Sequence, residues 1–383
     1  MNGTIYMPVG EVCSSISDTY REKKNMVTLI NTSDVLEGRA LNHERVPNSN
    51  LKGQFKKTFQ RDDILYSEIR PQNRRFAYVD FSPIDYIAST KLMVIRAKKD
   101  VVSPKYLYYF LKNSSTVAEL QLLAETRSGT FPQITFSEVA NLTIPVPSLA
   151  VQEVIVQTMQ CLEDKITCNE QINDNLQQQA MALYAEMFLN SSDNNVTSGT
   201  LSDIAVITMG QSPSGNSYNE DGVGEVFYQG RAEFGFRFPK RRLFTTEPKR
   251  MAETGDVLLS VRAPVGDLNV AYESCCIGRG LGAIHSKTGH SSFVLYTMFA
   301  LKSQLDVFNG EGTVFGSINR DALNAIPIDV PLVTKIDRFE AVAHPIDELI
   351  RTNYEENCRL EAIRDSLLPK LMSGEIDVSA VQL

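Results

Sequence analysis

The sequence of 383 residues predicts an α+β fold, in which two globular mixed α/β domains with mainly β cores are separated by two long helices. Three observations lead to this fold class. The second half of the chain repeats the first, each half contains short apolar runs typical of buried strands, and each half ends in a long segment with helical periodicity. The length agrees, because a chain of this size is expected to form two or three domains.

The internal repeat covers about half of the chain, so it indicates a duplicated module and not a solenoid. A shift of 184 positions aligns the second copy with the first without a gap, from Ile134 onward. Upstream, at a slightly different offset, Asp63–Ser67 matches Asp256–Ser260. The aligned pairs include Ile134 and Ile318, Leu142 and Ile326, Ile144 and Ile328, Pro147 and Pro331, and Pro71 and Pro264.

Each copy begins with a mixed segment in which apolar runs are broken by Gly, Pro, Asn and Ser. In DVLLSVRAPVGDLNV (256–270), the run from Val257 to Val261 predicts a buried strand that ends before a turn. These segments form the two predicted globular domains, residues 1–145 and 196–330.

Each copy then continues into a predicted spacer helix, in residues 146–195 and 331–383. Residues 148–189 contain no Gly or Pro and carry a narrow apolar seam at alternating spacings of three and four. The second helix repeats the seam, widens it with Ile346, Leu349 and Ile363, and is predicted to end at Ser373-Gly374. The residues expected to pair the helices are Ile166, Asn169, Asn173, Leu176 and Leu183 in the first copy, and Ile350, Asn353, Asn357, Leu360 and Leu367 in the second.

Two asparagines occupy matched positions in each seam, and two interpretations stay open. They mark a polar, partly solvated end of each helix, or they are buried where the two helices pair and fix the register through hydrogen bonds at some cost in stability.

Composition excludes several classes of protein. A hydrophobic content of 43% with 22% charged residues is ordinary for a globular protein and argues against disorder. No apolar run approaches the roughly 20 residues that cross a bilayer, and the N-terminal segment lacks a secretory pattern, so we expect no membrane partner and a cytoplasmic location. The six cysteines form no CxxC pair and are expected to be small buried hydrophobic residues.

The net charge of −8 argues at first against a nucleic-acid partner, because DNA binding draws on Lys and Arg to neutralise phosphates. The acidity lies largely in the helices, with −6 in residues 146–195 and −4 in 331–383, against +4 in 1–145 and −2 in 196–330. The globular segments contain basic clusters, IRPQNRR (69–75) and GRAEFGFRFPKRR (230–242). Phe, Gln and Asn between these charges can stack on bases or read base edges.

Signatures of catalysis are absent from the sequence. It has no phosphate-binding loop, no GxSxG elbow, no Asn-Pro-Pro-aromatic element and no HExxH pattern. The glycines of CIGRGLGAIH (276–285) are not followed by the βαβ unit and acidic residue of a dinucleotide site. We therefore expect neither a metal site nor a cofactor in this chain.

Several stretches together resemble the specificity subunit of type I restriction-modification systems, over nearly the whole chain and in the family's order. The resemblance is carried by LSDIAVITMGQSPSGNSYN (201–219), FYQG (227–230), DVLLSVRAPVGDLNV (256–270), LTIPVPSLAVQE (142–153) and SLLPKLMSGEIDV (366–378). Each piece alone is weak, and the duplicated arrangement makes the match specific.

The resemblance implies a non-catalytic DNA-reading subunit. Two target-recognition domains would each read one half of a bipartite site in double-stranded DNA, and the antiparallel helices would hold them apart. Two methyltransferase subunits would dock around the helices and bring S-adenosylmethionine, and restriction subunits would add ATP- and Mg-dependent translocation and cleavage.

The two copies also differ from each other. The second copy has Ile336 where the first has Gln152, and the first lacks a counterpart of Gly210-Gln211-Ser212-Pro213. We therefore expect two unlike half-sites and an asymmetric DNA target.

The residues expected to contact DNA are mostly arginines, because a guanidinium can bind guanine through two hydrogen bonds or hold a phosphate. The set is Arg70, Arg74, Arg75, Arg127, Arg231, Arg237, Lys240, Arg241, Arg242 and Arg262. Two other interpretations stay open, namely a two-domain scaffold whose helices bind protein partners without reading DNA, and an enzyme whose chemistry follows no known motif.

Overall fold

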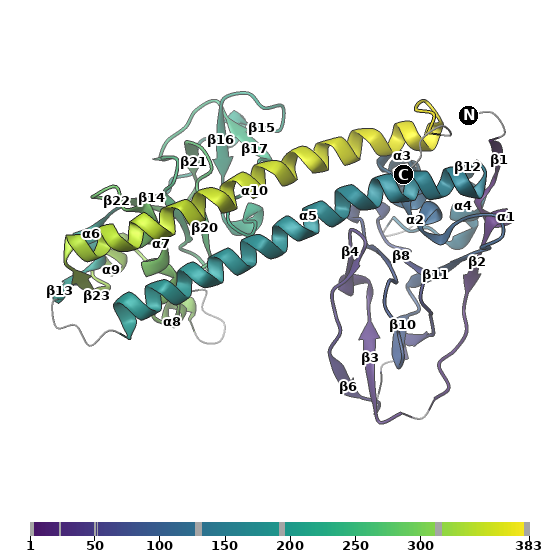
Figure 1. Cartoon of the computed structure of the whole chain (residues 1–383), viewed down its shortest axis with the longest axis horizontal. Coiled ribbons are helices and arrows are strands. Elements are labelled where there is room, and N and C mark those ends of the chain that lie inside the picture. Colours follow the sequence, from purple (N-terminus) through teal and green to yellow (C-terminus); the bar gives the residue numbers. More distant parts are fainter. Residues whose placement is uncertain are drawn as a thin grey trace. The chain divides into compact units, whose positions relative to one another are not determined.

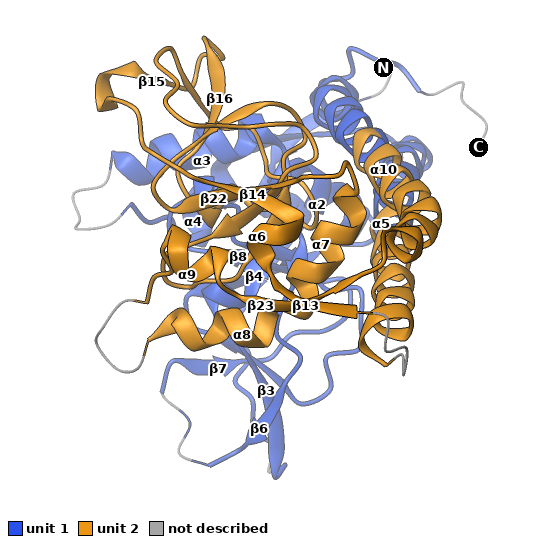
Figure 2. Cartoon of the chain, turned by 90° about the vertical axis from the view of Figure 1, so that its left-hand side faces the viewer, with its two compact units in different colours: residues 1–168, 356–383 blue, residues 169–355 orange. Residues whose placement is uncertain are grey.

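The structure, a computed structural model, describes residues 4–22, 24–49, 51, 53–126, 132–190, 196–310 and 316–378. The chain divides into two compact units, unit 1 (residues 1–168 and 356–383) and unit 2 (residues 169–355), coloured separately in Figure 2. Each unit combines a globular part with a stretch of both long helices, α5 (Leu149–Tyr184) and α10 (Val333–Ser373), which are the longest ribbons in Figure 1. The predicted α+β class with two long helices is confirmed.

Two β-sheets form the centre of unit 1. The strand order of the first is β2-β11-β8-β9, with every neighbouring pair antiparallel, and that of the second is β6-β3-β10-β7, in which β3 and β10 run parallel. The bounds are β2 (Cys13–Ile16), β3 (Met26–Ile30), β6 (Arg45–Pro47), β7 (Phe55–Lys57), β8 (Ile64–Ser67), β9 (Phe76–Tyr78), β10 (Tyr86–Ser89) and β11 (Leu92–Ala97).

Short strand pairs and helices complete unit 1. The strand pairs are β1 (Ile5–Pro8) with β12 (Thr143–Val146), and β4 (Val35–Leu36) with β5 (Arg39–Ala40). The helices are α1 (Val9–Val12), α2 (Pro104–Lys112), α3 (Ser114–Glu125) and α4 (Phe136–Asn141).

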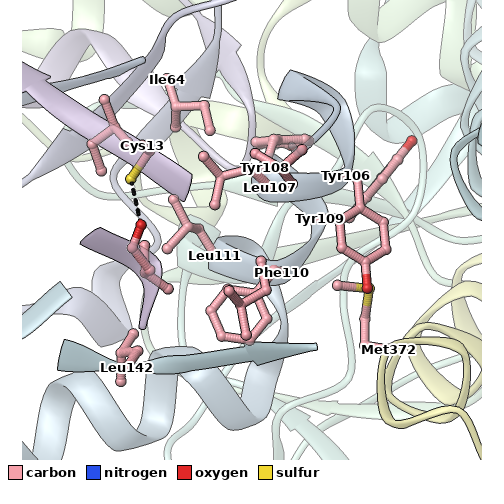
Figure 3. Packing of buried hydrophobic residues seen from close by; sticks show 14 of the residues in the cluster. Cys13, Ile64, Tyr106, Leu107, Tyr108, Tyr109, Phe110, Leu111, Leu142 and Met372 are labelled. Atoms are coloured by element: carbon pink, nitrogen blue, oxygen red, sulfur yellow. Dashed lines mark hydrogen bonds between the residues drawn. The ribbon is translucent and has the colours of Figure 1, made fainter. Parts of the chain in front are cut away.

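Strand β8 is buried on both faces, which explains its unbroken apolar run. Ile64 and Tyr66 pack in the cluster that contains α2 and the helix ends, whereas Leu65 packs in a second cluster with residues of β3, β10 and β11. The first cluster also holds Cys13, whose thiol donates a hydrogen bond to the carbonyl oxygen of Val9 at 3.2 Å (Figure 3).

The cysteines were expected to be buried, and only some of them are. Burial raises the pKa of the Cys13 thiol and of the Cys275 thiol to about 12, so both stay protonated as small hydrophobic groups. Cys276 is buried as well. The expectation is wrong for Cys161, Cys168 and Cys358, which are exposed on the long helices because the seam covers only one face of each helix.

Unit 2 repeats this arrangement. One sheet has the order β14-β22-β19-β20, the second has the order β15-β17-β16-β21-β18 with β16 and β21 parallel, and β13 pairs with β23. The strands are β13 (Val196–Thr200), β14 (Ala205–Met209), β15 (Tyr218–Asn219), β16 (Glu225–Tyr228), β17 (Leu243–Thr245), β18 (Met251–Ala252), β19 (Val257–Ser260), β20 (Leu268–Val270), β21 (Cys275–Ile277), β22 (Leu281–Ser286) and β23 (Pro327–Pro331). The helices are α6 (Leu201–Ile204), α7 (Ser291–Ala300), α8 (Lys302–Asp306) and α9 (Arg320–Asn324). The predicted strand at Val257 is β19, and all four of its residues are buried.

Helices α5 and α10 pack antiparallel within each unit. In unit 2 the Asn353 side-chain amide donates a hydrogen bond to Asn173 Oδ1 at 2.8 Å, and farther along α5 the Tyr184 ring lies edge-to-face on Phe339. In unit 1 the Asn357 side chain donates to the carbonyl oxygen of Ile166 at 3.4 Å. The positions on α10 fall as those on α5 rise, as antiparallel packing requires.

The seam residues differ in burial. Asn169, Asn173 and Asn353 are buried, as are Ile166 and Ile350, and Asn173 also donates to the carbonyl oxygen of Ile350. The four seam leucines (Leu176, Leu183, Leu360 and Leu367) are half-buried. Of the residues expected to widen the second seam, Ile346 packs on the unit 2 core, while Leu349 and Ile363 are exposed.

A short helix in each unit is fastened to a long helix by side-chain hydrogen bonds. Gln152 on α5 accepts from the Ser103 backbone N–H at the start of α2 and donates to the carbonyl oxygen of Val101. In unit 2, where Ile336 replaces glutamine, Glu340 one helical turn later accepts from the backbone N–H groups of Ser292 and Phe293 at the start of α7.

A carboxylate farther along each long helix makes the second attachment. Tyr109 of α2 donates to Glu163 at 2.8 Å, and Lys112 pairs with the same carboxylate. The equivalent residue of α10, Asp347, accepts from Tyr296 of α7 at 2.9 Å. Each globular part is thus held to the helices at corresponding places of the repeat.

Candidate nucleic-acid interface

The turns that follow β8 and β19 occupy the same place in the two units. We call residues 68–75 and 261–267 the anchored turns. In unit 1, Arg70 N–H donates to the carbonyl oxygen of Pro132 and Ile134 N–H donates to that of Glu68. In unit 2, Ala263 N–H donates to Gly316 and Ile318 N–H to Val261. The same main-chain bonds therefore hold two turns with different side chains.

The anchored turn of unit 1 presents three of the candidate arginines. Arg70 and Arg74 have left-handed backbone conformations, with φ of 46° and 51°, on either side of a short 3-10 turn (Pro71–Asn73). Arg70 is exposed, and the half-buried Arg74 and Arg75 donate to neutral oxygens, those of Ser114 and of the Ser33 carbonyl respectively. No carboxylate in the described part of the chain is recorded as an ion-pair partner of Arg74 or Arg75.

The candidates of unit 2 are compensated by acidic residues to a greater extent. Arg231 pairs with Asp267, Arg241 with Glu273, and Arg242 with Glu233 and Glu220. The hydrogen bonds that Arg242 donates to the Glu233 carboxylate raise the pKa of the Arg242 guanidinium further above its usual value. These pairs could not be predicted from the sequence, because each acidic partner is distant from its arginine along the chain or lies in another turn.

Arg262 and Lys240 differ from those three residues. Arg262 follows β19 on the anchored turn of unit 2, is exposed, and pairs through its backbone with Ser317. Lys240 is exposed next to the compensated pair Arg241–Glu273. These two residues are the cationic candidates of unit 2 for which no side-chain carboxylate partner occurs among the described residues.

Arg237 has a different position from all other candidates. Its side chain is only 4% exposed, and its guanidinium donates to Asp347 of α10 at 2.5 Å and to Gln177 of α5 at 3.0 Å. Nearby Asp347 raises the pKa of this guanidinium against the opposing effect of burial. Arg237 thus fastens its loop to the helices. Arg127, the remaining candidate, lies outside the described residues.

The described residues contain no cluster of three or more His, Cys, Asp or Glu side chains placed to hold a metal ion. Within the same residues, no helix combines the length and the apolar character needed to span a membrane. The features that stand out are the two anchored turns and their basic side chains.

Comparison with known proteins gives one consistent family. Residues 7–178 match the family model described as the type I restriction modification DNA specificity domain. The chain is 28% identical to the type I restriction enzyme HindI specificity subunit of Haemophilus influenzae, with 91% of this chain and 94% of the relative covered. It is 23% identical to the type I restriction enzyme MjaIX specificity subunit of Methanocaldococcus jannaschii, with 78% and 76% covered.

A solved structure shares the fold. The crystal structure of the type I restriction-modification system S subunit from M. genitalium aligns over 98% of this chain and 97% of that chain, with a TM-score of 0.55 at 16% identity. A repeated α+β unit, two long helices, a specificity-domain match and relatives that align along most of their length all agree. Residues 7–178 match the type I restriction modification DNA specificity domain, and along most of its length the chain is similar to type I restriction-modification specificity subunits.

Proposed function

We propose that this chain is the non-catalytic, sequence-reading subunit of a type I restriction-modification complex and that it reads an asymmetric bipartite target in double-stranded DNA, one unit for each half-site. The observation that carries the proposal is the pair of anchored turns. Both sit at the same place of the repeat and are fixed by the same main-chain hydrogen bonds, yet their side chains differ. Equivalent scaffolds with different contact residues suit two unlike half-sites.

In this proposal Arg70, Arg74 and Arg75 contact one half-site, and Arg262 and Lys240 contact the other, with the paired arginines of unit 2 at its edge. Two methyltransferase subunits dock along the helices, and restriction subunits join through them. S-adenosylmethionine, ATP and Mg then serve the partners, and this chain supplies no group to the methyl transfer or to cleavage.

The experiment is methylome sequencing of a host that expresses the chain with its methyltransferase subunit. The proposal expects one bipartite methylated motif. Exchange of residues 196–330 for another recognition domain should change one half of the motif and leave the other half unchanged.

Two outcomes would contradict the proposal. If methylation occurs without a bipartite motif, or if the motif survives the exchange, unit 2 does not read DNA. A stable complex with the methyltransferase that methylates no defined sequence would favour a protein scaffold instead.

A further inference from the structure

Each unit contains a cavity between its short helix (α2 or α7) and the long helices, at corresponding positions of the repeat. In unit 1 the long-helix lining consists of Gln160, Glu163, Asp164, Ile166, Thr167 and Arg364. A shift of 184 positions carries four of these α5 residues onto the α10 lining of the unit 2 cavity, which consists of His344, Asp347, Glu348 and Arg351. The two cavities are therefore the same feature in two copies.

The two copies differ in size. The cavity in unit 1 measures about 470 Å³, and that in unit 2 about 60 Å³. In unit 2, Arg237 and Phe238 fill the space from the loop after β16. Arg237 binds Asp347 as described above, and the buried Phe238 ring packs against the rings of Tyr272 and Tyr354 with centroids 5.6 and 5.0 Å apart.

In unit 1 the carboxylate equivalent to Asp347 is neutralised differently. Lys112, on α2 itself, pairs with Glu163 and lies over the rings of Tyr108 and Tyr109. The cavity wall also bears the aromatic side chains of Tyr108 on α2, Tyr78 on β9 and the nearby Phe81. The charge of Glu163 is therefore satisfied, yet a space large enough for several side chains stays open beside it.

Charged side chains line the mouth of this cavity, and carboxylates are in excess. Glu37 and Asp80 line it, and both are exposed. Among the cations of the lining, Lys112 binds Glu163 and Arg364 binds Asp365, whereas Lys105 binds the neutral Gln160 and Arg39 is exposed in the same lining. No described residue forms an ion pair with the side chain of Glu37 or Asp80. The carboxylates of Glu37, Asp80 and Asp164 outnumber the remaining cations of the lining, Arg39 and Lys105, and this excess of negative charge favours a cationic occupant.

The wall that carries Glu37 has a fixed shape. Gly38, with φ of 104°, turns the backbone directly over Tyr108, and a Cβ atom at Gly38 would lie 2.1 Å from the Tyr108 hydroxyl oxygen. A left-handed glycine pressed on a buried ring leaves this turn little freedom. The cavity is therefore preformed.

We propose that the open cavity of unit 1 binds a segment of a protein partner in which an arginine adjoins an aromatic residue, the pair that fills the equivalent cavity of unit 2 from within the chain. The guanidinium lies between the carboxylates of Glu37, Asp80 and Asp164, and the aromatic ring packs on Tyr78 and Phe81. An arginine suits this site because its planar fork both pairs with carboxylates and stacks on rings. The proposal does not depend on DNA recognition.

The test uses the full chain and a fluorescent peptide of sequence GFRFPK, which copies residues 235–240. Fluorescence anisotropy should show saturable binding at one site per chain. Hydrogen exchange should show protection in residues 160–167 and not in 344–351. Replacement of the peptide arginine by glutamine should weaken binding roughly tenfold, the effect of one charge-assisted pair.

Matched variants locate the contact. Glu37→Gln with Asp80→Asn should weaken binding at least as much as the glutamine peptide does. The control, Asp100→Asn with Glu119→Gln, removes two other exposed carboxylates of unit 1 and should leave binding unchanged.

Three results would overturn the proposal. The first is the absence of saturable binding by the intact chain, and the second is equal weakening by the test and control variants. The third is unchanged affinity when both peptide phenylalanines become alanine, which would show attraction to surface charge only. Because the assay contains no DNA, none of these results bears on the proposed reading of a half-site.

Discussion

Gln152 and Glu340 show how the same attachment can be made from two different positions of the repeat. Both side chains accept backbone N–H groups at the start of a short helix, where no carbonyl of the helix can serve as partner. Gln152 in addition donates to the carbonyl oxygens of Val101 and Pro147, which a carboxylate cannot do. The sequence comparison found the substitution of Gln152 by Ile336 but could not show that Glu340 replaces it.

Gln152→Glu should therefore destabilise unit 1 by about 2–3 kcal/mol, because it places a charged acceptor against two buried carbonyl oxygens. Glu340→Gln keeps one acceptor oxygen and should cost only about 1 kcal/mol. Hydrogen exchange of α2 and α7 under native conditions measures each helix separately. Equal effects of the two variants would show that the amide donors of Gln152 contribute nothing.

The intramolecular pairs of the unit 2 arginines separate the candidates for DNA contact. Arg262→Ala should reduce affinity for the second half-site about tenfold or more, as expected when a base contact worth about 1–3 kcal/mol is lost. Arg241→Ala should reduce it less, because Glu273 already binds that guanidinium. Titrations with the intact site and with each half-site altered provide the measurement. An equal loss for Arg262→Ala on every DNA sequence would identify a phosphate contact.

At the scale of elements, the long helices depend on packing as much as on their own sequence. Helix α10 continues through Pro345 and Pro369, although each proline removes one hydrogen bond of the helix. Phe339, Ala343 and Ile350 are buried around the first of these prolines, and Leu368, Leu371 and Met372 around the second. Burial of these side chains on both sides of each break keeps the helix continuous.

The buried asparagines give a prediction for the helix pair in unit 2. Asn353→Leu alone should cost about 1–3 kcal/mol, because it leaves the Asn173 side-chain oxygen buried without a donor. The double change Asn173→Leu with Asn353→Leu should recover most of this loss and make the register less specific. Denaturant unfolding measures the coupling, and Asn175→Leu at an exposed position of α5 is the control. Additive effects of the two changes would show that the asparagines do not act as a pair.

At the scale of the whole molecule, the repeat and the seam periodicity were sufficient to predict the fold class, the two long helices and the buried strand at Val257. Periodicity reports which residues are buried, and burial decides these elements. Other features depend on contacts between residues that are distant in the sequence, and no local pattern encodes such contacts. These features are the pairing of strands and the ion pairs of Arg231, Arg237 and Arg241.

Buried tyrosines predict how the stability of the molecule depends on pH. Burial raises the pKa of Tyr184 to about 12, and burial raises the pKa of Tyr66, Tyr106, Tyr108, Tyr109, Tyr228 and Tyr296 further above the usual value of 10.0. Their contribution to stability is present below pH 10 and is lost as pH rises above it, because the unfolded tyrosines ionise first. Burial lowers the pKa of Lys57 and Lys112. These two lysines make the free energy of unfolding rise with pH, but only below about pH 10.5.

We therefore expect the free energy of unfolding to fall steeply above about pH 10.5, by about 1.4 kcal/mol per pH unit for each such tyrosine. Urea unfolding at several pH values, followed with tyrosine absorbance, measures the slope. Tyr66→Phe should reduce the slope by one such increment, and Tyr6→Phe, at an exposed position, should not change it. A slope that Tyr66→Phe leaves unaltered would contradict this assignment.

The anchored turns have a consequence for how such a protein can evolve. Main-chain groups hold both turns, and every residue type except proline offers the same N–H and C=O groups. Arg70 in one unit and Ala263 in the other occupy the same anchored position, as do Pro132 and Gly316 on the accepting side. Point mutations in these turns can therefore accumulate with little loss of stability. If the turns read DNA as proposed, such mutations would change the recognised sequence while the fold stays the same.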